Sequence, residues 1–361
     1  MGMSELEALR KELDRINVGI LELISARAQV VERIGAEKRK QGVPGFDPVR
    51  ESVMLEYLVS RNQGPFDDDT IRRLFKPIFR ASLELLEEER KKHLLVTRKR
   101  KREDTIIEVK GIAIGGGAPV ILAGPCAVES MGQMRAVASS LKKQGVNLLR
   151  AGAYKSRTSP YDFQGLGLEG LEILQQVGSE FGMVTISELN SVSELEQISA
   201  YVDIIEISPK NMQNFTLLQA VGDANIPVIL KRAKAATLEE LLLSAEYIVS
   251  RGNQQVILME RGIRTFEKWT RNTLDISAVP ILKQESHLPV LVDISHSTGR
   301  KDIMLPCAKA SIAAGADGIL VEVHPDPTIS LSDSQLQLSI PEFNELSEVL
   351  APQLRPSIRK Q

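Results

Sequence analysis

The chain has 361 residues, of which 43% are hydrophobic and 25% are charged, the composition of an ordinary globular protein. This composition excludes wholesale disorder, and the length favours two domains over one. The 45 Lys and Arg residues nearly balance the 47 Asp and Glu residues, so the net charge of −2 gives no reason to expect a nucleic acid or a membrane surface as partner.

The expected compartment follows from the apolar runs and the cysteines. No apolar run approaches the roughly 20 residues of a membrane-spanning helix, and the charged start of the chain lacks the apolar core of a signal peptide. The two cysteines, Cys126 and Cys307, are too few for a disulfide framework. We therefore expect a cytoplasmic protein in a reducing environment.

The first quarter of the chain predicts three helices. Apolar residues recur at helical spacing over residues 4–40, 47–61 and 69–92. Ser4 and Glu7 have the spacing of a capping box at the start of the first helix, and Pro77 is expected to kink or shorten the third. Together these helices predict an all-α domain over residues 1–92.

A basic run follows this domain. Arg98–Arg102 is a run of five Lys or Arg residues with no aromatic side chains between them for base stacking. A solvated linker over residues 93–104 is therefore favoured over a nucleic-acid-binding arm. After the linker, residues 105–110 and 111–115 predict a small β-hairpin.

The remaining chain, residues 105–361, alternates short apolar runs with stretches that can hold a helix. The runs of the buried-strand type are Val120–Ala123, Leu148–Ala151, Met183–Ser187, Ile204–Ile207, Val228–Leu230, Val256–Met259, Val290–Val292 and Gly318–Val321. Eight such strands alternating with helices predict an α/β fold, a (β/α)8 TIM barrel. A doubly wound sheet is the alternative, but no GxGxxG turn follows the first strand.

Chemically active residues gather where these strands are expected to end, which is where such barrels hold their reacting groups. The cations at these positions are Arg150, Lys155, Lys210, Lys231 and Arg261. Because unpaired like charges converging on one mouth would destabilise it, they indicate strongly anionic ligands, most simply phosphates and carboxylates.

A possible metal site lies at the same mouth. Cys126, His296, Glu322 and Asp333 offer the mixed sulfur, nitrogen and oxygen ligands that suit Mn, Fe, Co or Zn. Each residue also has a purely structural interpretation. Cys126 fits a buried small residue, His296 a hydrogen-bonded core histidine, and Asp333 a helix cap.

Six motifs, in this order along the chain, carry a family resemblance. They are Gly124-Pro125-Cys126, Lys155-x-Arg157-Thr158-Ser159-Pro160 with its continuation to Gly165, and the segments 211–215, 260–264, 296–300 and 322–327. From about Thr105 to the C-terminus they resemble the type I beta 3-deoxy-D-arabino-heptulosonate 7-phosphate (DAHP) synthases. The preceding helices, with Phe46-Asp47-Pro48-Val49-Arg50-Glu51, resemble the chorismate mutase domain that some bacterial members carry.

The resemblance implies the condensation of phosphoenolpyruvate with erythrose 4-phosphate, the first step of the shikimate pathway to aromatic amino acids. The implied ligands of one divalent metal ion are Cys126, His296, Glu322 and Asp333. The implied phosphoenolpyruvate-binding residues are Arg150, Lys155, Lys210, Lys231 and Arg261, and the implied erythrose 4-phosphate-binding residues are Arg157, Thr158 and Ser159. Lys155, Cys126 and His296 form the implied catalytic set, with Lys155 as general acid.

Several positions depart from the family pattern. Ser156 replaces the proline of a Lys-Pro-Arg-Thr motif, and Lys210 replaces an arginine, which keeps the charge but loses bidentate phosphate binding. Ala151 and Ala233 occupy usual glycine positions. These departures leave open a non-catalytic or impaired regulatory paralogue, although the intact metal set favours a working enzyme.

A second alternative is 3-deoxy-D-manno-octulosonate 8-phosphate synthase, which uses the same barrel with a five-carbon sugar phosphate. The loop at residues 157–160 and the fused helical domain argue against it.

For the helical domain, the resemblance implies that chorismate or prephenate binds to Arg10, Arg27, Lys38, Asp47, Arg50 and Glu51. Arg27 and Lys38 project about 20° apart on the first helix. Leu86 replaces the Gln or Glu that donates to the breaking ether bond. We therefore predict a domain that regulates the synthase by binding chorismate or prephenate and has weak mutase activity at best. The resemblance also implies a dimer through this domain and a tetramer overall, and a purely structural dimerisation module is the alternative.

Overall fold

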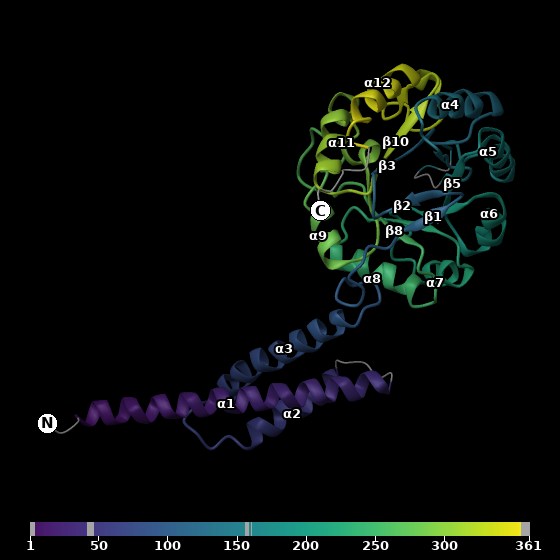
Figure 1. Ribbon diagram of the computed structural model, residues 1–361. Helices are drawn as coiled ribbons and strands as arrows, with labels where there is room; N and C mark the ends of the chain where they lie inside the picture. Colours follow the sequence, from purple (N-terminus) through teal and green to yellow (C-terminus); the bar gives the residue numbers. More distant parts are fainter. Residues whose placement is uncertain (1–3, 42–46, 156–158, 160, 355–361) are drawn as a thin grey trace. The chain divides into compact units, whose positions relative to one another are not determined.

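The computed structural model describes residues 4–41, 47–155, 159 and 161–354. The chain divides into two compact units between Leu94 and Leu95, a helical unit and a barrel unit (Figure 1). Within the described part of the chain, no helix has the length and apolar character needed to cross a bilayer.

The helical unit consists of α1 (Glu5–Lys40), α2 (Pro48–Ser60) and α3 (Asp68–Lys92). The predicted capping box is confirmed, because Glu7 N donates to Ser4 Oγ at 3.3 Å and Ser4 N donates to a Glu7 carboxylate oxygen at 3.1 Å. Of the two effects predicted for Pro77, the shortening is wrong, since α3 continues through it, and the kink stays a prediction. Contacts of α3 with both α1 and α2 outweigh the loss of one backbone hydrogen bond.

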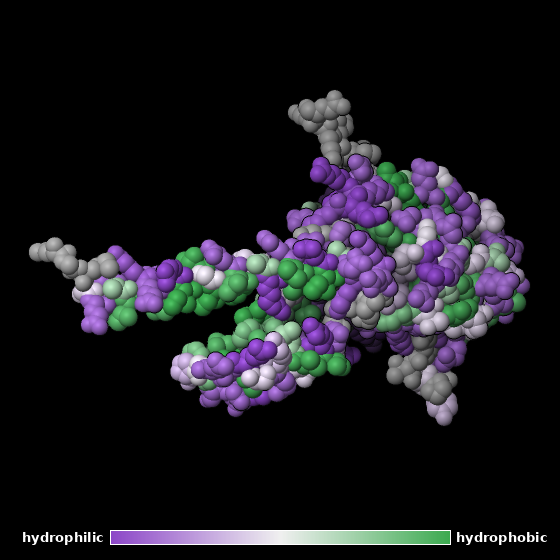
Figure 2. All heavy atoms as spheres, turned by 90° about the horizontal axis from the view of Figure 1, so that it is seen from below, coloured by the Kyte–Doolittle hydropathy of each residue, from purple (hydrophilic) through white to green (hydrophobic). Residues whose placement is uncertain are grey.

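The apolar side of α1 is uncovered within one copy of the chain. Its large hydrophobic residues are between 49% and 73% exposed at Leu6, Leu9, Leu13, Ile16, Ile20, Leu23, Val30 and Ile34. Figure 2 shows hydrophobic side chains following one another along the helix that leads away from the N-terminus. An exposed apolar surface of this length is unusual for a protein surface that contacts only water.

The barrel unit has eight parallel strands among the described residues. They are β3 (Val120–Gly124), β4 (Leu148–Arg150), β5 (Val184–Leu189), β6 (Ile204–Ile207), β7 (Val228–Lys231), β8 (Val256–Glu260), β9 (Val290–Asp293) and β10 (Gly318–His324). Because β10 pairs with both β9 and β3, the sheet closes on itself, which confirms the predicted (β/α)8 barrel. A short strand, β11 (Leu338–Ser339), is added beside β10.

Helices surround this barrel on the outside (Figure 1). They are α4 (Met131–Lys143), α5 (Leu168–Phe181), α6 (Leu195–Tyr201), α7 (Phe215–Ala224), α8 (Leu238–Val249), α9 (Ala278–Glu285), α11 (Met304–Ala313) and α12 (Ile340–Leu350), with short 3₁₀ turns at Val192–Glu194, Lys301–Ile303 and Pro327–Ile329. The short helix α10 (Ile294–Thr298) follows β9 directly, and all five of its residues are buried. Almost every strand residue of the barrel is buried. This burial explains why the strands are continuous apolar runs in the sequence.

A hairpin closes one end of the barrel. Its strands β1 (Ile107–Val109) and β2 (Ile112–Ile114) pair antiparallel, as predicted. Ile107, Val109 and Ile114 pack in one apolar cluster with the first residues of several barrel strands, such as Leu148 and Val184. Because the hairpin fills the N-terminal end, the accessible end of the barrel is the one where the strands finish.

Part of the predicted linker packs against the barrel unit. Val96 and Thr97 are buried, and the backbone N–H groups of Leu95 and Val96 donate to the Glu246 carboxylate at 3.0 and 3.1 Å. Residues 95–98 therefore belong to the barrel unit rather than to a solvated linker.

Candidate active site

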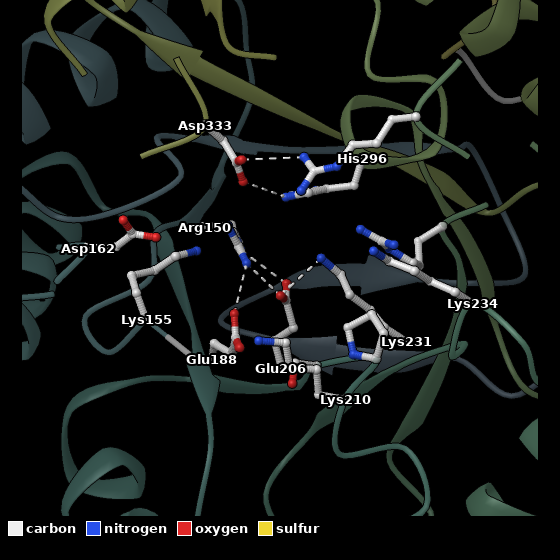
Figure 3. Close-up of a pocket in the computed structure, with 14 residues that line it drawn as sticks. Arg150, Lys155, Asp162, Glu188, Glu206, Lys210, Lys231, Lys234, His296 and Asp333 are labelled. Carbon is white, nitrogen blue, oxygen red and sulfur yellow. Dashed lines mark hydrogen bonds and ion pairs between the residues drawn. The ribbon is translucent and has the colours of Figure 1, made fainter. Parts of the chain in front are cut away.

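A cavity of about 270 Å³ opens at the C-terminal ends of the strands (Figure 3). Seven cationic side chains line it, against four carboxylates and one imidazole. The cations are Arg150, Lys155, Lys210, Lys231, Lys234, Arg261 and Arg271, and the other ionisable groups are Asp162, Glu188, Glu206, Asp333 and His296. This excess of positive charge suits a ligand that carries more than one negative charge.

The floor of the cavity is a buried ionic network centred on Glu206 of β6. Its carboxylate accepts hydrogen bonds from Arg150 at 2.6 and 3.1 Å and lies 3.0 Å from Lys231 Nζ. Burial alone would raise the pKa of Glu206, but the charges of Arg150 and Lys231 outweigh burial and lower this pKa to about 2. Arg150 also reaches Glu322 at 3.1 Å, and Lys231 reaches Asp293 at 3.0 Å. Both cations are therefore fixed in place by carboxylates.

A close approach of two backbones positions Cys126. Gly124 ends β3 with φ +152°, and a Cβ there would lie 2.1 Å from the Arg150 carbonyl oxygen. Only glycine allows this approach, so the chain after β3 turns beside the end of β4. The turn leaves Cys126 fully buried at the edge of the cavity.

The four predicted metal ligands meet at this edge. One donor atom from each of Cys126, Glu322 and Asp333 lies within 4.8 Å of the other two. His296 Nε2 lies 3.4 Å from Glu322 Oε1 and 3.7 Å from Asp333 Oδ2. The His296 ring is oriented by Asp293, whose Oδ2 lies 2.8 Å from Nδ1.

The donor set fits a divalent metal ion. Glu322 Oε2 is buried and has no hydrogen-bond partner among the described residues. An unpartnered buried carboxylate oxygen is costly, and a bound cation removes that cost. Thiolate, imidazole and carboxylate donors together suit an ion of borderline softness, such as Mn, Fe, Co or Zn.

Buried hydrogen bonds hold the loop that carries Asp333 against Cys126. Gln337 is fully buried; its side-chain oxygen accepts from Cys126 N at 2.9 Å, and its Nε2 donates to Ser332 O at 2.8 Å. Glu129 accepts from Leu331 N at 3.0 Å. These bonds explain how residues more than 200 positions apart in the sequence reach one site.

Lys155 lies between the metal-ligand cluster and the floor. Its ammonium group donates to the Cys126 carbonyl oxygen at 3.2 Å. Burial opposes its charged form, but the negative charges of Cys126 and Glu188 outweigh burial and raise the pKa of Lys155. The raised pKa keeps Lys155 protonated at neutral pH, which is what the role of general acid predicted for it requires.

On the opposite side of the cavity, Arg261 follows β8. Its side chain is buried, and its Nη1 has no hydrogen-bond partner among the described residues. Burial, above all, lowers its pKa. Lys210 lines the same cavity, so the structure brings together all five residues predicted to bind phosphoenolpyruvate.

Of the three residues predicted to bind erythrose 4-phosphate, the structure describes Ser159. Arg157 and Thr158 lie outside the described residues, as does the departure at Ser156. Ser159 Oγ accepts a hydrogen bond from Tyr161 N at 3.3 Å, and Asp162 lines the cavity.

Sequence reasoning missed three lining residues, Glu206, Lys234 and Arg271. Glu206 stands inside an apolar run rather than at its end, and a charged residue in a buried strand was the available signal. Arg271 Nη1 lies 3.3 Å from Asp333 Oδ1. This ion pair joins two loops that are far apart in the sequence.

In the helical unit, a cavity lies beside one of the six predicted chorismate-binding residues. Of the six, only Arg27 lines the mostly apolar cavity between α1 and α3. Its guanidinium lies 5.0 Å from the centre of the Phe79 ring and donates to Ser82. Asp47 accepts from Arg50 N at 2.9 Å, which makes it the N-cap of α2.

The other three residues, together with Leu86, differ in exposure. Arg10 is exposed, whereas Lys38, Glu51 and Leu86 are half-buried. One copy of the unit therefore presents Arg27 as its candidate anion-binding group at this cavity.

Comparison with known proteins assigns both parts of the chain to families. Residues 99–355 match the family model of the DAHP synthetase I family, and residues 9–87 match that of chorismate mutase type II. A phospho-2-dehydro-3-deoxyheptonate aldolase of Thermotoga maritima is 52% identical over 256 residues, which cover 71% of this chain and 76% of the relative. A 2-dehydro-3-deoxyphosphooctonate aldolase of Syntrophobacter fumaroxidans is 30% identical, covering 67% of this chain and 90% of the relative.

Solved structures give the same result. The crystal structure of the Thermotoga maritima phospho-2-dehydro-3-deoxyheptonate aldolase (DAHP synthase) superposes with a TM-score of 0.70 and 50% identity, covering 72% of this chain and 78% of that chain. A truncated form of 3-deoxy-D-arabino-heptulosonate 7-phosphate synthase from Thermotoga maritima has a TM-score of 0.68 and 48% identity, covering 72% and 98%. The predicted resemblance is confirmed: this chain belongs to the DAHP synthetase I family and carries a chorismate mutase type II domain at its N-terminal end.

Proposed function

We propose that the protein is a metal-dependent DAHP synthase of the cytoplasm, which condenses phosphoenolpyruvate with erythrose 4-phosphate to DAHP and phosphate. The observation that carries the proposal is the cavity itself, in which seven cations surround a space next to a Cys–His–Glu–Asp cluster. Two phosphorylated substrates account for the cations, and an aldehyde that must be polarised accounts for the cluster.

The cations bind and orient phosphoenolpyruvate. Arg150 and Lys231 are held rigidly by buried carboxylates. Little side-chain conformational entropy is therefore lost when they bind the substrate. Lys210 and Arg261 hold the phosphate. Arg157, Thr158 and Ser159 hold erythrose 4-phosphate, as the family resemblance implies.

Lys155 holds a proton at Nζ close to the site of reaction. C3 of phosphoenolpyruvate attacks the aldehyde carbon, and the oxygen that gains the electron pair takes the proton from Lys155. Water adds to the positively polarised C2 and loses a proton, which gives a hemiketal phosphate. The C2–O bond then breaks, its electron pair leaves with the protonated phosphate group, and the remaining hydroxyl loses its proton to become the C2 ketone of DAHP. A divalent ion held by Cys126, His296, Glu322 and Asp333 supplies Lewis acidity to the aldehyde.

Loss of phosphoenolpyruvate absorbance tests this function. The full chain with erythrose 4-phosphate and Mn²⁺ is expected to consume phosphoenolpyruvate, chelation is expected to abolish consumption, and added metal is expected to restore it. A five-carbon sugar phosphate in place of erythrose 4-phosphate is expected to react poorly. No consumption with any divalent metal contradicts the proposal and favours a non-catalytic paralogue.

The helical unit is proposed to regulate the synthase by binding chorismate or prephenate. Arg27 retains a charge suited to a substrate carboxylate, and the cavity beside it is otherwise mostly apolar. Leu86 cannot donate a hydrogen bond to the ether oxygen, so the transition state of the mutase reaction lacks a stabilising group.

The protein is therefore expected to show feedback inhibition of the synthase reaction but little mutase turnover. The mutase kcat is expected to lie at least about tenfold below that of an ordinary helical mutase, while prephenate or chorismate inhibits phosphoenolpyruvate consumption. Arg27→Ala is expected to abolish inhibition and leave uninhibited synthase activity intact. Arg80→Ala, which removes an exposed arginine of the same unit, serves as the control. Mutase turnover near that of an ordinary enzyme would contradict this proposal.

A second copy of the chain is proposed to cover the exposed apolar side of α1, and a tetramer is the expected assembly. The support is the length of that surface, which water contacts in a single copy. Sedimentation of the full chain as a monomer at micromolar concentration would contradict a dimer.

A further inference from the structure

Lys234 lies beside other cations of the cavity. The pKa of Lys234 is lowered, by burial first and then by the positive charges of Arg261 and Arg271. The end of the cavity that holds Lys234 is thus positively charged.

Lys234 lies on the loop after β7, three residues after Lys231, which ends that strand. Its carbonyl oxygen accepts from Arg264 N at 2.8 Å, which ties this loop to the loop after β8. Figure 3 shows its side chain extending into the cavity on the same side as Lys231. No carboxylate of the described residues forms an ion pair with Lys234, whereas Lys231 has Glu206 and Asp293.

Arg261 gives a second, independent observation at the positive end. Only 5% of this residue is exposed, and its Nη1 has no hydrogen-bond partner among the described residues. A buried guanidinium N–H group without an acceptor is rare, because each lost hydrogen bond costs free energy. Lys234 and Arg261 are therefore two cations of this cavity for which the described residues supply no ion pair.

We propose that Lys234 is a further substrate-binding residue, which together with Arg261 binds the phosphate group of phosphoenolpyruvate. The proposal rests on the proposed function for the identity of the substrate. It adds a cation on the β7 loop at a site where Lys210, in place of the usual arginine, offers a point charge rather than a bidentate fork.

The order of the strands indicates that Lys234 and Arg261 bind the phosphate of phosphoenolpyruvate rather than that of erythrose 4-phosphate. The loop expected to hold erythrose 4-phosphate follows β4, and β4 is separated from β8 by three strands in either direction around the closed barrel. Lys234 and Arg261 follow β7 and β8, so they face the substrate from the opposite wall. A phosphate bound there points the carbon atoms of phosphoenolpyruvate toward Lys155 and the metal-ligand cluster, where the chemistry takes place.

The test compares Lys234→Met and Lys234→Arg with the wild-type full chain loaded with Mn²⁺. Lys234→Met is expected to raise the Kd of phosphoenolpyruvate, measured by calorimetry, about tenfold, because one charge-assisted hydrogen bond is lost. Its KM for phosphoenolpyruvate is expected to rise by a similar factor, with kcat and the KM for erythrose 4-phosphate little changed. Lys234→Arg is expected to restore most of the affinity. Lys268→Met, which removes an exposed lysine outside the cavity lining, controls for the loss of one charge.

Each other outcome is decisive. An unchanged Kd for phosphoenolpyruvate in Lys234→Met overturns the proposal. A rise in the KM for erythrose 4-phosphate alone also overturns it, because the phosphate would then belong to the other substrate. If the wild type binds phosphoenolpyruvate but shows no turnover, and Lys234→Met weakens that binding, the proposed function fails while the assignment of Lys234 holds.

Discussion

Replacing Cys126 with alanine is expected to lower kcat of the synthase reaction by at least about 10³-fold, because the loss of one ligand removes several kcal/mol of Lewis-acid stabilisation. Cys126 is the only sulfur donor in the cluster and lies 3.6 Å from Asp333 Oδ2. The measurement is phosphoenolpyruvate consumption at saturating substrates over a range of Mn²⁺ concentrations. A Co²⁺-substituted protein adds a second readout, since its thiolate charge-transfer absorption is expected to disappear in Cys126→Ala.

Cys307→Ala provides the matched control for this substitution. Cys307 lies on α11, is half-buried, and does not line the cavity. Burial raises its pKa, so at neutral pH it is a thiol rather than a metal-binding thiolate. We expect Cys307→Ala to retain metal-dependent activity and the Co²⁺ absorption. Metal-dependent turnover within tenfold of wild type in Cys126→Ala would contradict the assigned role.

The barrel was predictable because its strands are buried on both faces. Runs such as Ile204–Ile207 and Val228–Leu230 consist almost entirely of apolar residues. Their alternation with helical segments can therefore be recognised in a single sequence. The same rule placed Lys231 and Arg261 correctly, because a charge that follows such a run must lie at a strand end.

The rest of the site depends on contacts that sequence spacing does not encode. Asp333 reaches the cluster through a loop fixed by Gln337 and Glu129, and only the family resemblance selected it in advance. Three cations stand close together at the end of β7: Lys231, Arg232 and Lys234. Arg232 pairs with Glu260, whereas the two lysines line the cavity, and the local sequence does not distinguish these cases. In the helical unit, the apolar pattern of α1 predicted a buried face, but the other helices of that unit do not bury it.

The largest effect on folding is expected from Arg150→Met. Arg150 is 2% exposed, and its guanidinium lies between Glu206, Glu322 and Glu188. Removal of the cation leaves buried carboxylates without their partner, which typically costs about 3–5 kcal/mol of the free energy of unfolding. Urea unfolding of the barrel unit at neutral pH, followed by circular dichroism, measures this loss. Arg251→Met is the matched control, because its ion pair with Asp223 is exposed, and we expect little change there.

The pH dependence of this loss identifies its cause. In the wild type the folded-state pKa of Glu206 is about 2, below its ordinary value of 4.5, so its ionised form stabilises the protein above pH 4.5 and this stabilisation disappears as the pH falls toward 2. In Arg150→Met the pKa of Glu206 is expected to rise, because burial is then opposed by Lys231 alone. The variant is therefore expected to fall furthest below wild type at neutral pH and to approach it as the pH falls, because Glu206, left with Lys231 as its cationic partner, then takes up a proton.

The double variant Arg150→Met/Glu206→Gln separates charge from packing. If the uncompensated carboxylate is the cause, a neutral amide at position 206 is expected to recover part of the lost free energy of unfolding at neutral pH, and the difference between neutral and acidic pH is expected to shrink. A deficit that is the same at both pH values, and that Glu206→Gln does not relieve, would instead assign the loss to the packing of the arginine side chain. The ionic floor would then be a consequence of the barrel's shape rather than a source of its stability.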